Sequence, residues 1–316
     1  MQGQQRTQMS FGDMDVARHA SPEHFLVKVN ELVDWQPFVP VLGSLYSHTG
    51  RPSHPPLVMF KMLLLGQWYG LSDVEVEDAC RDRLSFMRFL GVGLGDPIPD
   101  QSVLVRFRQR LLGDRAARML FDRVLEQLDA RGLLIRRGTL IDATIVQSAR
   151  KPPTKGGKDS SDHEAGWTVK RGETTHGYKA HVAADEASGM VRATILTPAN
   201  VHDSQVADDL IQFDEQTVYA DKAYDSEARR QRLKDHGIGD GILHKGRRSR
   251  PLTASQIESN KANSPIRSGI EKWFGDWKER RGYRRCRYLG LEMNQLHLTL
   301  LAMAHNLRRM VVLSTA

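Results

Sequence analysis

Apolar residues recur every three to four positions between residues 21 and 132, which is the spacing of packed helices. Four helix starts are marked in this stretch. One is a capping box, in which Ser72 precedes Glu75 by three residues. The other three are opened by proline, at Pro22, Pro55–Pro56 and Pro99. The pattern predicts a helical domain over residues 21–135, preceded by a polar, mobile leader over residues 1–20.

From Gly138 the pattern changes to short apolar runs rich in β-branched residues, which are typical of strands. The predicted strands are 138–148, 178–184, 190–197, 217–221 and 241–244, and the predicted helices are 226–236 and 289–312. A stretch rich in Pro, Gly, Ser and Lys, residues 151–177, is predicted to be a flexible loop. Together these elements predict an α/β domain over residues 136–316 that ends in helices.

A further helix is predicted over residues 264–281, where Ser264 and Pro265 mark the start and Gly282 the end. At the helical period its apolar stripe consists of Ile266, Ile270, Trp273 and Trp277. The neighbouring stripe consists of Arg267, Glu271, Phe274 and Lys278. A carboxylate between two cations beside a packing face indicates a functional site. The alternative is an ordinary solvated helix, on which such ion pairs contribute roughly 0.2–0.5 kcal/mol each.

Two more acids belong to the predicted strands. Asp142 lies inside the first apolar run, and Asp221 ends the fourth. An Asp is costly to bury unpaired, so either Asp142 is a hydrogen-bonded structural residue or it has a chemical role. For Asp221, the alternative to a chemical role is that of a turn residue at the end of the strand. The nearby Asp225 is predicted to cap the next helix. If Asp142, Asp221 and Glu271 converge, they form an oxygen-rich site for Mg²⁺ or Mn²⁺, and two such ions about 4 Å apart can activate water or a 3′-hydroxyl toward a phosphodiester.

The charge balance favours an anionic partner. The chain has 45 Lys plus Arg against 38 Asp plus Glu, a net charge of +7, and a pI of about 9.5. The basic residues gather in three patches: 278–287, which includes Lys278, Arg284 and Arg285; 244–250; and Arg106, Arg108 and Arg110. Each patch alone is also compatible with a solvated face, but beside a carboxylate site they are better interpreted as phosphate contacts. The helical domain is therefore predicted to bind DNA, with a packing or dimerisation module as the alternative.

Cysteine usage and hydropathy give an expected compartment. The two cysteines, Cys80 and Cys286, are too few for a disulfide framework, which favours a reducing cytoplasm. The polar amino-terminal stretch does not resemble a signal peptide. The longest apolar runs are far shorter than the roughly 20 residues of a membrane helix. We expect a cytoplasmic, nucleoid-associated protein without membrane contact.

Several short motifs resemble a known family. They are IDAT at 141–144, GYKAHVAAD at 177–185, NVHDS at 200–204, YADKAYDS at 219–226 and the spacing Arg267-x₃-Glu271-x₆-Lys278. Over nearly the whole length, the chain resembles the DDE transposases of bacterial insertion sequences, close to the insertion sequence five family in the insertion sequence four/five superfamily. Where the related insertion sequence four pattern has a Tyr three residues before the Arg, this chain has Ser264. The resemblance implies a ribonuclease-H-like (retroviral-integrase-like) catalytic core in which Asp142, Asp221 and Glu271 bind two Mg²⁺ or Mn²⁺ ions.

The expected function is transposition. The enzyme would cut phosphodiester bonds at the terminal inverted repeats of a mobile element and join the 3′-hydroxyl to target DNA, with Arg267 and Lys278 holding the phosphates around the scissile bond. A homodimer on double-stranded DNA is expected because an element has two ends. Two alternatives stay open at this point: a metal-dependent nuclease of the same fold that cuts without joining, and a DNA-binding regulator with relic catalytic acids.

Overall fold

The computed structural model describes residues 21–315 except for 22, 48, 51, 114, 153–161, 171 and 247. The predicted leader over residues 1–20 and the proline at position 22 lie outside the described residues. By contacts between its residues, the chain divides into a helical unit, up to Arg131 together with Thr299 onward, and a sheet unit, Gly132–Leu298. The predicted domain boundaries stay predictions.

The helical unit is built from α2 (Phe25–Leu32), α3 (Phe38–Gly43), α4 (Pro56–Tyr69), α5 (Asp73–Asp82), α6 (Leu84–Leu90), α7 (Gln101–Gly113), α8 (Ala116–Ala130) and the part of α13 (Leu291–Ser314) that begins at Thr299. The predicted capping box is confirmed, because Ser72 accepts from the Glu75 amide while Glu75 accepts from the Ser72 amide. Helix α4 is buried on nearly all sides, which explains why its sequence is apolar without a polar face.

One lysine is buried within this helical packing. The Lys61 ammonium donates to Asn30 Oδ1 at 3.0 Å and to the Phe89 carbonyl at 2.9 Å. It also lies 4.5 Å from the centre of the Trp35 ring. Burial lowers the pKa of Lys61 to about 7. The cation is therefore satisfied inside the unit and is a packing residue.

In its described residues the sheet unit contains six strands: β1 (Thr139–Gln147), β2 (Gly166–Lys170), β3 (Glu173–Asp185), β4 (Val191–Pro198), β5 (Thr217–Ala220) and β6 (Gly239–Ile242). Their order is β2-β3-β1-β5-β6, and β4 also pairs with β3. The predicted hairpin is confirmed, since β3 and β4 pair antiparallel. The loop predicted over 151–177 is wrong at its end, where β2 and the start of β3 form a hairpin. The expected mixed α/β class is confirmed.

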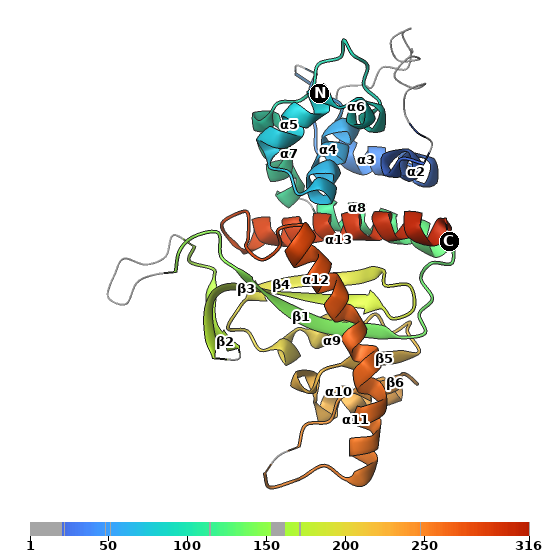
Figure 1. The fold of residues 1–316 in the computed structure, drawn as a ribbon, viewed down its shortest axis with the longest axis vertical. Coiled ribbons are helices and arrows are strands. Elements are labelled where there is room, and N and C mark those ends of the chain that lie inside the picture. Colours follow the sequence, from blue (N-terminus) through green and yellow to red (C-terminus); the bar gives the residue numbers. More distant parts are fainter. Residues whose placement is uncertain are drawn as a thin grey trace. The chain divides into compact units, whose positions relative to one another are not determined.

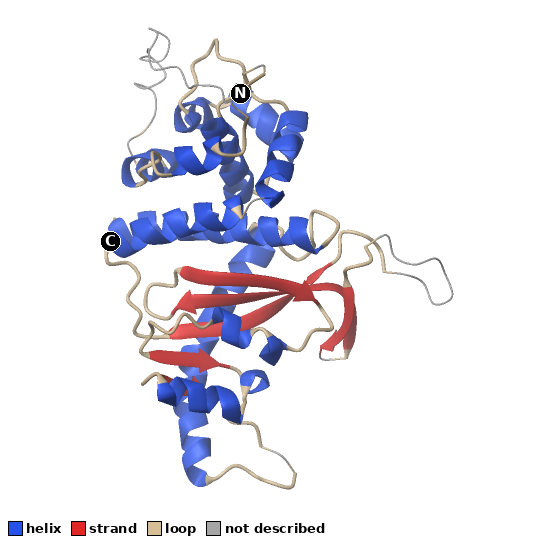
Figure 2. Cartoon of the chain, turned by 180° about the vertical axis from the view of Figure 1, so that it is seen from behind, coloured by secondary structure: helices blue, strands red, loops and turns tan. Residues whose placement is uncertain are grey.

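Helices cover both faces of this sheet. On one face lie α9 (Ala207–Leu210) and α10 (Glu227–Asp235), and on the other lie α11 (Ala254–Arg267) and α12 (Glu271–Arg280), as the opposite views in Figures 1 and 2 show. Ile141 packs in the apolar core with Leu210 of α9 and Leu233 of α10. Because side chains alternate along a strand, Leu140 and Asp142 face the other way, toward α12. A Cβ built on Gly269 would lie 3.5 Å from Leu140 Cδ1, in agreement with this placement.

The helix predicted over 264–281 is wrong at its start. Helix α11 begins ten residues earlier, where Thr253 and Gln256 form a capping box, and Pro265 lies inside its last turns. A 3₁₀ turn, Ser268–Ile270, then leads into α12. The predicted end at Gly282 is confirmed, since its φ of +67° is the left-handed conformation that glycine adopts readily.

The packing face of α12 also differs from the predicted stripe. Its buried residues are Phe274 and Trp277, with Ile270 of the preceding turn. Trp273 is half-buried and lies against Gly189, where a Cβ would come within 2.4 Å of the indole. Gly189 has a φ of +72°, so its backbone conformation favours glycine, and the indole leaves no room for a Cβ atom. The turn between β3 and β4 thereby anchors the helix that carries Glu271.

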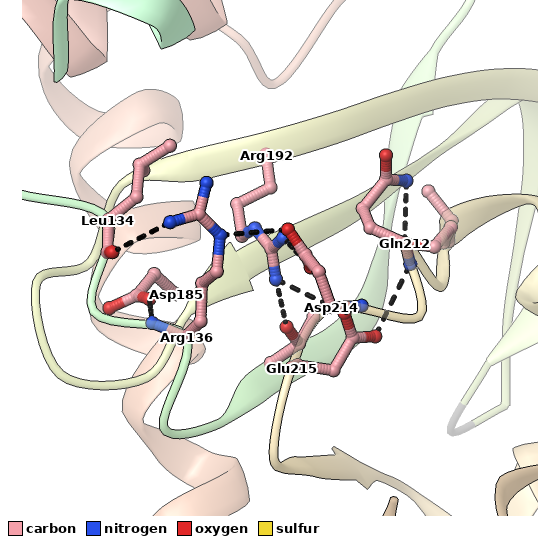
Figure 3. Close-up of polar contacts among 9 residues, drawn as sticks. Leu134, Arg136, Asp185, Arg192, Gln212, Asp214 and Glu215 are labelled. Atoms are coloured by element: carbon pink, nitrogen blue, oxygen red, sulfur yellow. Dashed lines mark hydrogen bonds and ion pairs between the residues drawn. The ribbon is translucent and has the colours of Figure 1, made fainter. Parts of the chain in front are cut away.

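A polar cluster holds the start of β1 in place (Figure 3). Arg192 of β4 donates to Thr139 Oγ1 at 2.8 Å and pairs with Asp214 and with Glu215. The Arg136 side chain reaches Asp214 at 2.8 Å. The side chains of Arg192 and Glu215 are 4% and 0% exposed, so each charge depends on the other for compensation.

Candidate catalytic site

Three acids predicted to act together line one pocket of about 790 Å³. Asp142 lies in the middle of β1, Asp221 follows the end of β5, and Glu271 begins α12. The register explains how two of them meet. Strands β1 and β5 are parallel, with Ile141 opposite Ala220, so the next position on each strand carries an aspartate. The sheet therefore aligns Asp142 with Asp221, and α12 brings Glu271 to the same pocket.

Asp142 is more enclosed than Glu271, since their side chains are 15% and 59% exposed. Its Oδ1 accepts from the Ala143 amide at 2.8 Å, and its Oδ2 accepts from Arg267 at 2.8 Å. Burial raises the pKa of Asp142, and this effect exceeds the lowering by Arg267 and by the Ala143 amide. The carboxylate is thus held in a place where a cation would be strongly favoured.

Arg267 at the end of α11 bridges two of the acids. Its guanidinium donates to Asp142 at 2.8 Å and to Glu271 at 2.7 Å. Burial acts to lower the pKa of Arg267, but Asp142, Asp221 and Glu271 together raise it. The predicted phosphate contact is therefore engaged with the carboxylates in this arrangement. Arg267 serves as their counter-ion.

The donor set fits a divalent cation by its chemistry, because carboxylate oxygens are the ligands that Mg²⁺ and Mn²⁺ prefer. Within the described residues, however, no group of three or more His, Cys, Asp or Glu side chains is close enough to hold a metal ion. The guanidinium of Arg267 pairs with both Asp142 and Glu271 in this arrangement.

Asp225 is not the helix cap that its position predicted. Helix α10 has Ser226 as its N-cap residue, without a side-chain hydrogen bond. The Asp225 carboxylate instead accepts from Arg230 at 3.0 Å and from the Lys245 amide at 2.8 Å. It thus ties α10 to the segment after β6, because Arg230 lies in α10 and Lys245 follows β6.

The cations of the carboxy-terminal patch divide between two environments. Lys278 and Arg284 line the same pocket as the acids, whereas Arg285 does not. Arg285 donates from Nε to the Ser148 carbonyl at 3.0 Å, and its backbone lies beside the end of β1. Arg284 forms an ion pair with Glu279. Lys170 also lines the pocket and was missed, because its strand fell in a segment interpreted as a loop.

In the helical unit, Arg106 and Arg110 lie one turn apart on the exposed side of α7 and line a cavity of about 830 Å³. The Arg110 guanidinium lies 4.4 Å from the centre of the Tyr46 ring. Both arginines are accessible to a partner, as the prediction of phosphate contacts requires, but their role stays a prediction.

The structure does not support the prediction that Arg108 is a phosphate contact. Its side chain is only 5% exposed and makes two hydrogen bonds to Asp73, at 2.5 and 3.0 Å. The helical period gives the reason, since Arg108 lies on the same face as the buried Leu104 and Leu111. A bidentate pair buried in the unit holds α5 against α7, so Arg108 is not available to DNA.

Comparisons with known proteins identify the family. Residues 134–307 match the family model described as "Transposase DDE domain", and residues 15–110 match "Transposase domain (DUF772)". The chain therefore belongs to the DDE transposase family, and it is an enzyme of DNA transposition and recombination. The prediction from the motifs is confirmed at this level, whereas the insertion sequence five assignment stays a prediction.

Among solved structures, the chain is similar to the piggyBac transposase synaptic complex with hairpin DNA. The identity is 11%, the match covers 91% of this chain and 73% of that chain, and the TM-score is 0.44. No helix in the described part of the chain combines the length and apolar character needed to span a membrane.

Proposed function

We propose that the pocket lined by Asp142, Asp221 and Glu271 is the active site of the transposase, on a ribonuclease-H-like (retroviral-integrase-like) core. The observation that carries this proposal is the meeting of three acids from two parallel strands and a helix in one pocket. The protein would cut phosphodiester bonds at the terminal inverted repeats of its element, and the freed 3′-hydroxyl would then attack target DNA.

The three carboxylates would hold two Mg²⁺ or Mn²⁺ ions, which supply an activated oxygen nucleophile and stabilise the leaving oxygen of the phosphodiester. The chain's own residues do the rest. Arg267, which pairs with Asp142 and Glu271, would leave these acids when they hold a cation and would then contact a phosphate. Lys278 and Arg284 hold the strand beside the scissile bond. In each step a new phosphorus–oxygen bond forms as another breaks, so the enzyme needs no covalent intermediate.

The helical domain over residues 21–135 would recognise the terminal inverted repeats, with Arg106 and Arg110 as phosphate contacts. Two observations support this role: both side chains are accessible, and both border the same large cavity. Two copies of the chain would pair the two ends of the element as a homodimer. The reaction would take place in the bacterial cytoplasm, at the nucleoid.

The test is incubation with the element's own ends, a target duplex and Mg²⁺ or Mn²⁺. Asp142→Asn, Asp221→Asn and Glu271→Gln should each lower the rate of cleavage at least about a thousandfold, as loss of an essential catalytic group does. Binding to the ends should survive, because the acids repel phosphate. Asp225→Asn is the control, since this carboxylate is close in sequence to Asp221 but does not line the pocket.

The products separate the alternatives. Joined strands are expected from a transposase. Cleavage without joined strands would indicate a nuclease of the same fold. Retained binding without any metal-dependent cleavage in the unsubstituted protein would indicate a regulator with relic acids. Substantial cleavage by any one of the three variants would overturn the assignment of the site.

A further inference from the structure

The side of the pocket away from the sheet centre is formed by the hairpin of β2 and β3. Lys170 pairs with Glu173 across this hairpin, and Thr168 pairs with Thr175. Because directly opposed residues share a face of the sheet, Lys170 projects to the same side as Glu173 and Thr175. All three residues line the pocket. The orientation of Lys170 toward the acids is thus fixed by strand register.

Lys170 shares this side of the pocket with two other cations. Burial lowers the pKa of Lys278 first, and the charges of Lys170 and Arg284 lower it further. The three cations are therefore within electrostatic reach of one another. Arg284 has Glu279 as an ion-pair partner. Among the residues that the structure describes, neither Lys170 nor Lys278 forms an ion pair, although Glu173 lies opposite Lys170 in the hairpin.

Like charges that lie together repel one another, and among the described residues two of these three cations, Lys170 and Lys278, form no ion pair. Their repulsion raises the free energy of the folded chain and needs an explanation. A bound anion would relieve the repulsion and convert three unfavourable neighbours into three charge-assisted contacts. The pocket also holds Asp142, Asp221 and Glu271, which an isolated small anion would have to approach. A polyanionic strand can contact the cations with one phosphate while another phosphate lies at the acids.

We propose that Lys170, together with Lys278 and Arg284, forms a binding site for a backbone phosphate of the DNA strand that enters the pocket. Lys170 thereby makes the hairpin of β2 and β3 a substrate-positioning element. This inference rests on the proposed active site. It adds a residue from a different part of the chain to the contacts expected from the carboxy-terminal patch.

The test compares Lys170→Ala and Lys170→Arg with the control Lys272→Ala. Lys272 is adjacent to Glu271 in the chain but lies 5.4 Å from the centre of the Trp273 ring and does not line the pocket. Binding of an element-end duplex is measured by fluorescence anisotropy over a series of salt concentrations, without divalent metal. Single-turnover cleavage at saturating DNA is measured separately.

Lys170→Ala should weaken binding roughly tenfold, as loss of a contact to a charged group does. The slope of log affinity against log salt should become shallower by roughly 0.9, the value for one neutralised phosphate on duplex DNA. Lys170→Arg should restore both quantities, and Lys272→Ala should match the unsubstituted protein. The melting temperature of Lys170→Ala should change little, because the substitution removes the repulsion of Lys278 together with the attraction of Asp142.

Three results would overturn the inference. One is an unchanged affinity and slope in Lys170→Ala. Another is an equal loss in Lys272→Ala, which would indicate a general charge effect. The third is weaker binding of inorganic phosphate by Lys170→Ala with unchanged binding of DNA, which would indicate a site for free phosphate. Because the binding measurement needs no metal and no cleavage, it stands or fails independently of the triad variants.

Discussion

Two clusters of charged residues lie along β1, and they differ in how their charges are compensated. At the start of the strand, Arg192 is paired with Asp214 and Glu215 and bonded to Thr139. Beyond its middle, Lys170 and Lys278 gather without ion-pair partners among the described residues, close to acids that share one arginine. Each buried charge in the first cluster has its partner within the chain, whereas the second cluster has cations and carboxylates still available for ligands.

This difference separates charges that stabilise the sheet from charges that are kept for activity. Buried charges that are fully paired fix the position of a strand, as Arg192 does in Figure 3. Charges held together with their own sign cost free energy, and natural proteins keep such sites where activity requires them. The two clusters should therefore respond oppositely to removal of a cation.

The largest effect is expected from Arg192→Met. This change leaves the carboxylate of Glu215 buried without its partner, which should lower the free energy of unfolding by about 3–5 kcal/mol. Urea unfolding followed by circular dichroism measures the loss. Arg137→Met is the matched control, because Arg137 is 65% exposed in its pair with Glu186 and such a surface pair contributes little to stability. Equal losses in the two variants would contradict the structural role of Arg192.

The same variant should show a particular pH dependence. Burial raises the pKa of Glu215, and its hydrogen bond with Asp214 raises this pKa further. The charge of Arg192 opposes this increase. Without Arg192 the pKa of Glu215 rises further above its unfolded value. A carboxyl whose folded pKa is raised contributes stability below its unfolded pKa and loses it as the pH rises through the folded pKa. The defect of Arg192→Met should therefore grow from pH 5 to pH 8, and a defect that is constant over this range would contradict the assignment to Glu215.

A smaller effect of opposite sign is expected from Lys278→Met. Removing one cation relieves two like-charge neighbours, Lys170 and Arg284, each unfavourable by roughly 0.2–0.5 kcal/mol, so stability should rise by about 0.5 kcal/mol. Differential scanning calorimetry at low salt measures the change, with Lys272→Met as the control. Affinity for the element ends should fall in the Lys278 variant alone. A loss of stability above about 1 kcal/mol would mean that Lys278 is a packing residue.

Part of the site could be predicted from the sequence because it depends on local patterns. Asp142 lies inside one short apolar run and Asp221 ends another, and parallel pairing of those runs brings the two acids to the same level of the sheet. Glu271 follows Arg267 at helical spacing, and the structure keeps that spacing across a 3₁₀ turn. The three acids could therefore be predicted together from the sequence. Their roles are to be tested by the experiments described above.

The rest depends on long-range pairing that local patterns do not encode. Lys170 belongs to an edge strand that forms only against β3, within a stretch whose composition is typical of loops. Arg108 was interpreted with its neighbours as an exposed patch, although its spacing from Leu104 and Leu111 indicates the buried face of α7. The engagement of Arg267 with two acids is likewise a product of the fold, since Asp142 is 125 positions away in the chain.

The central claim is that Asp142, Asp221 and Glu271 bind the catalytic cations once Arg267 releases them. The most direct test is anomalous diffraction from crystals of the protein with an element-end duplex and Mn²⁺. We predict anomalous peaks in contact with carboxylate oxygens of all three acids, and an Arg267 guanidinium that has left Asp142 and Glu271. Mn²⁺ bound at another place in the chain, or an Arg267 that still bridges both acids in the presence of DNA and Mn²⁺, would contradict the claim.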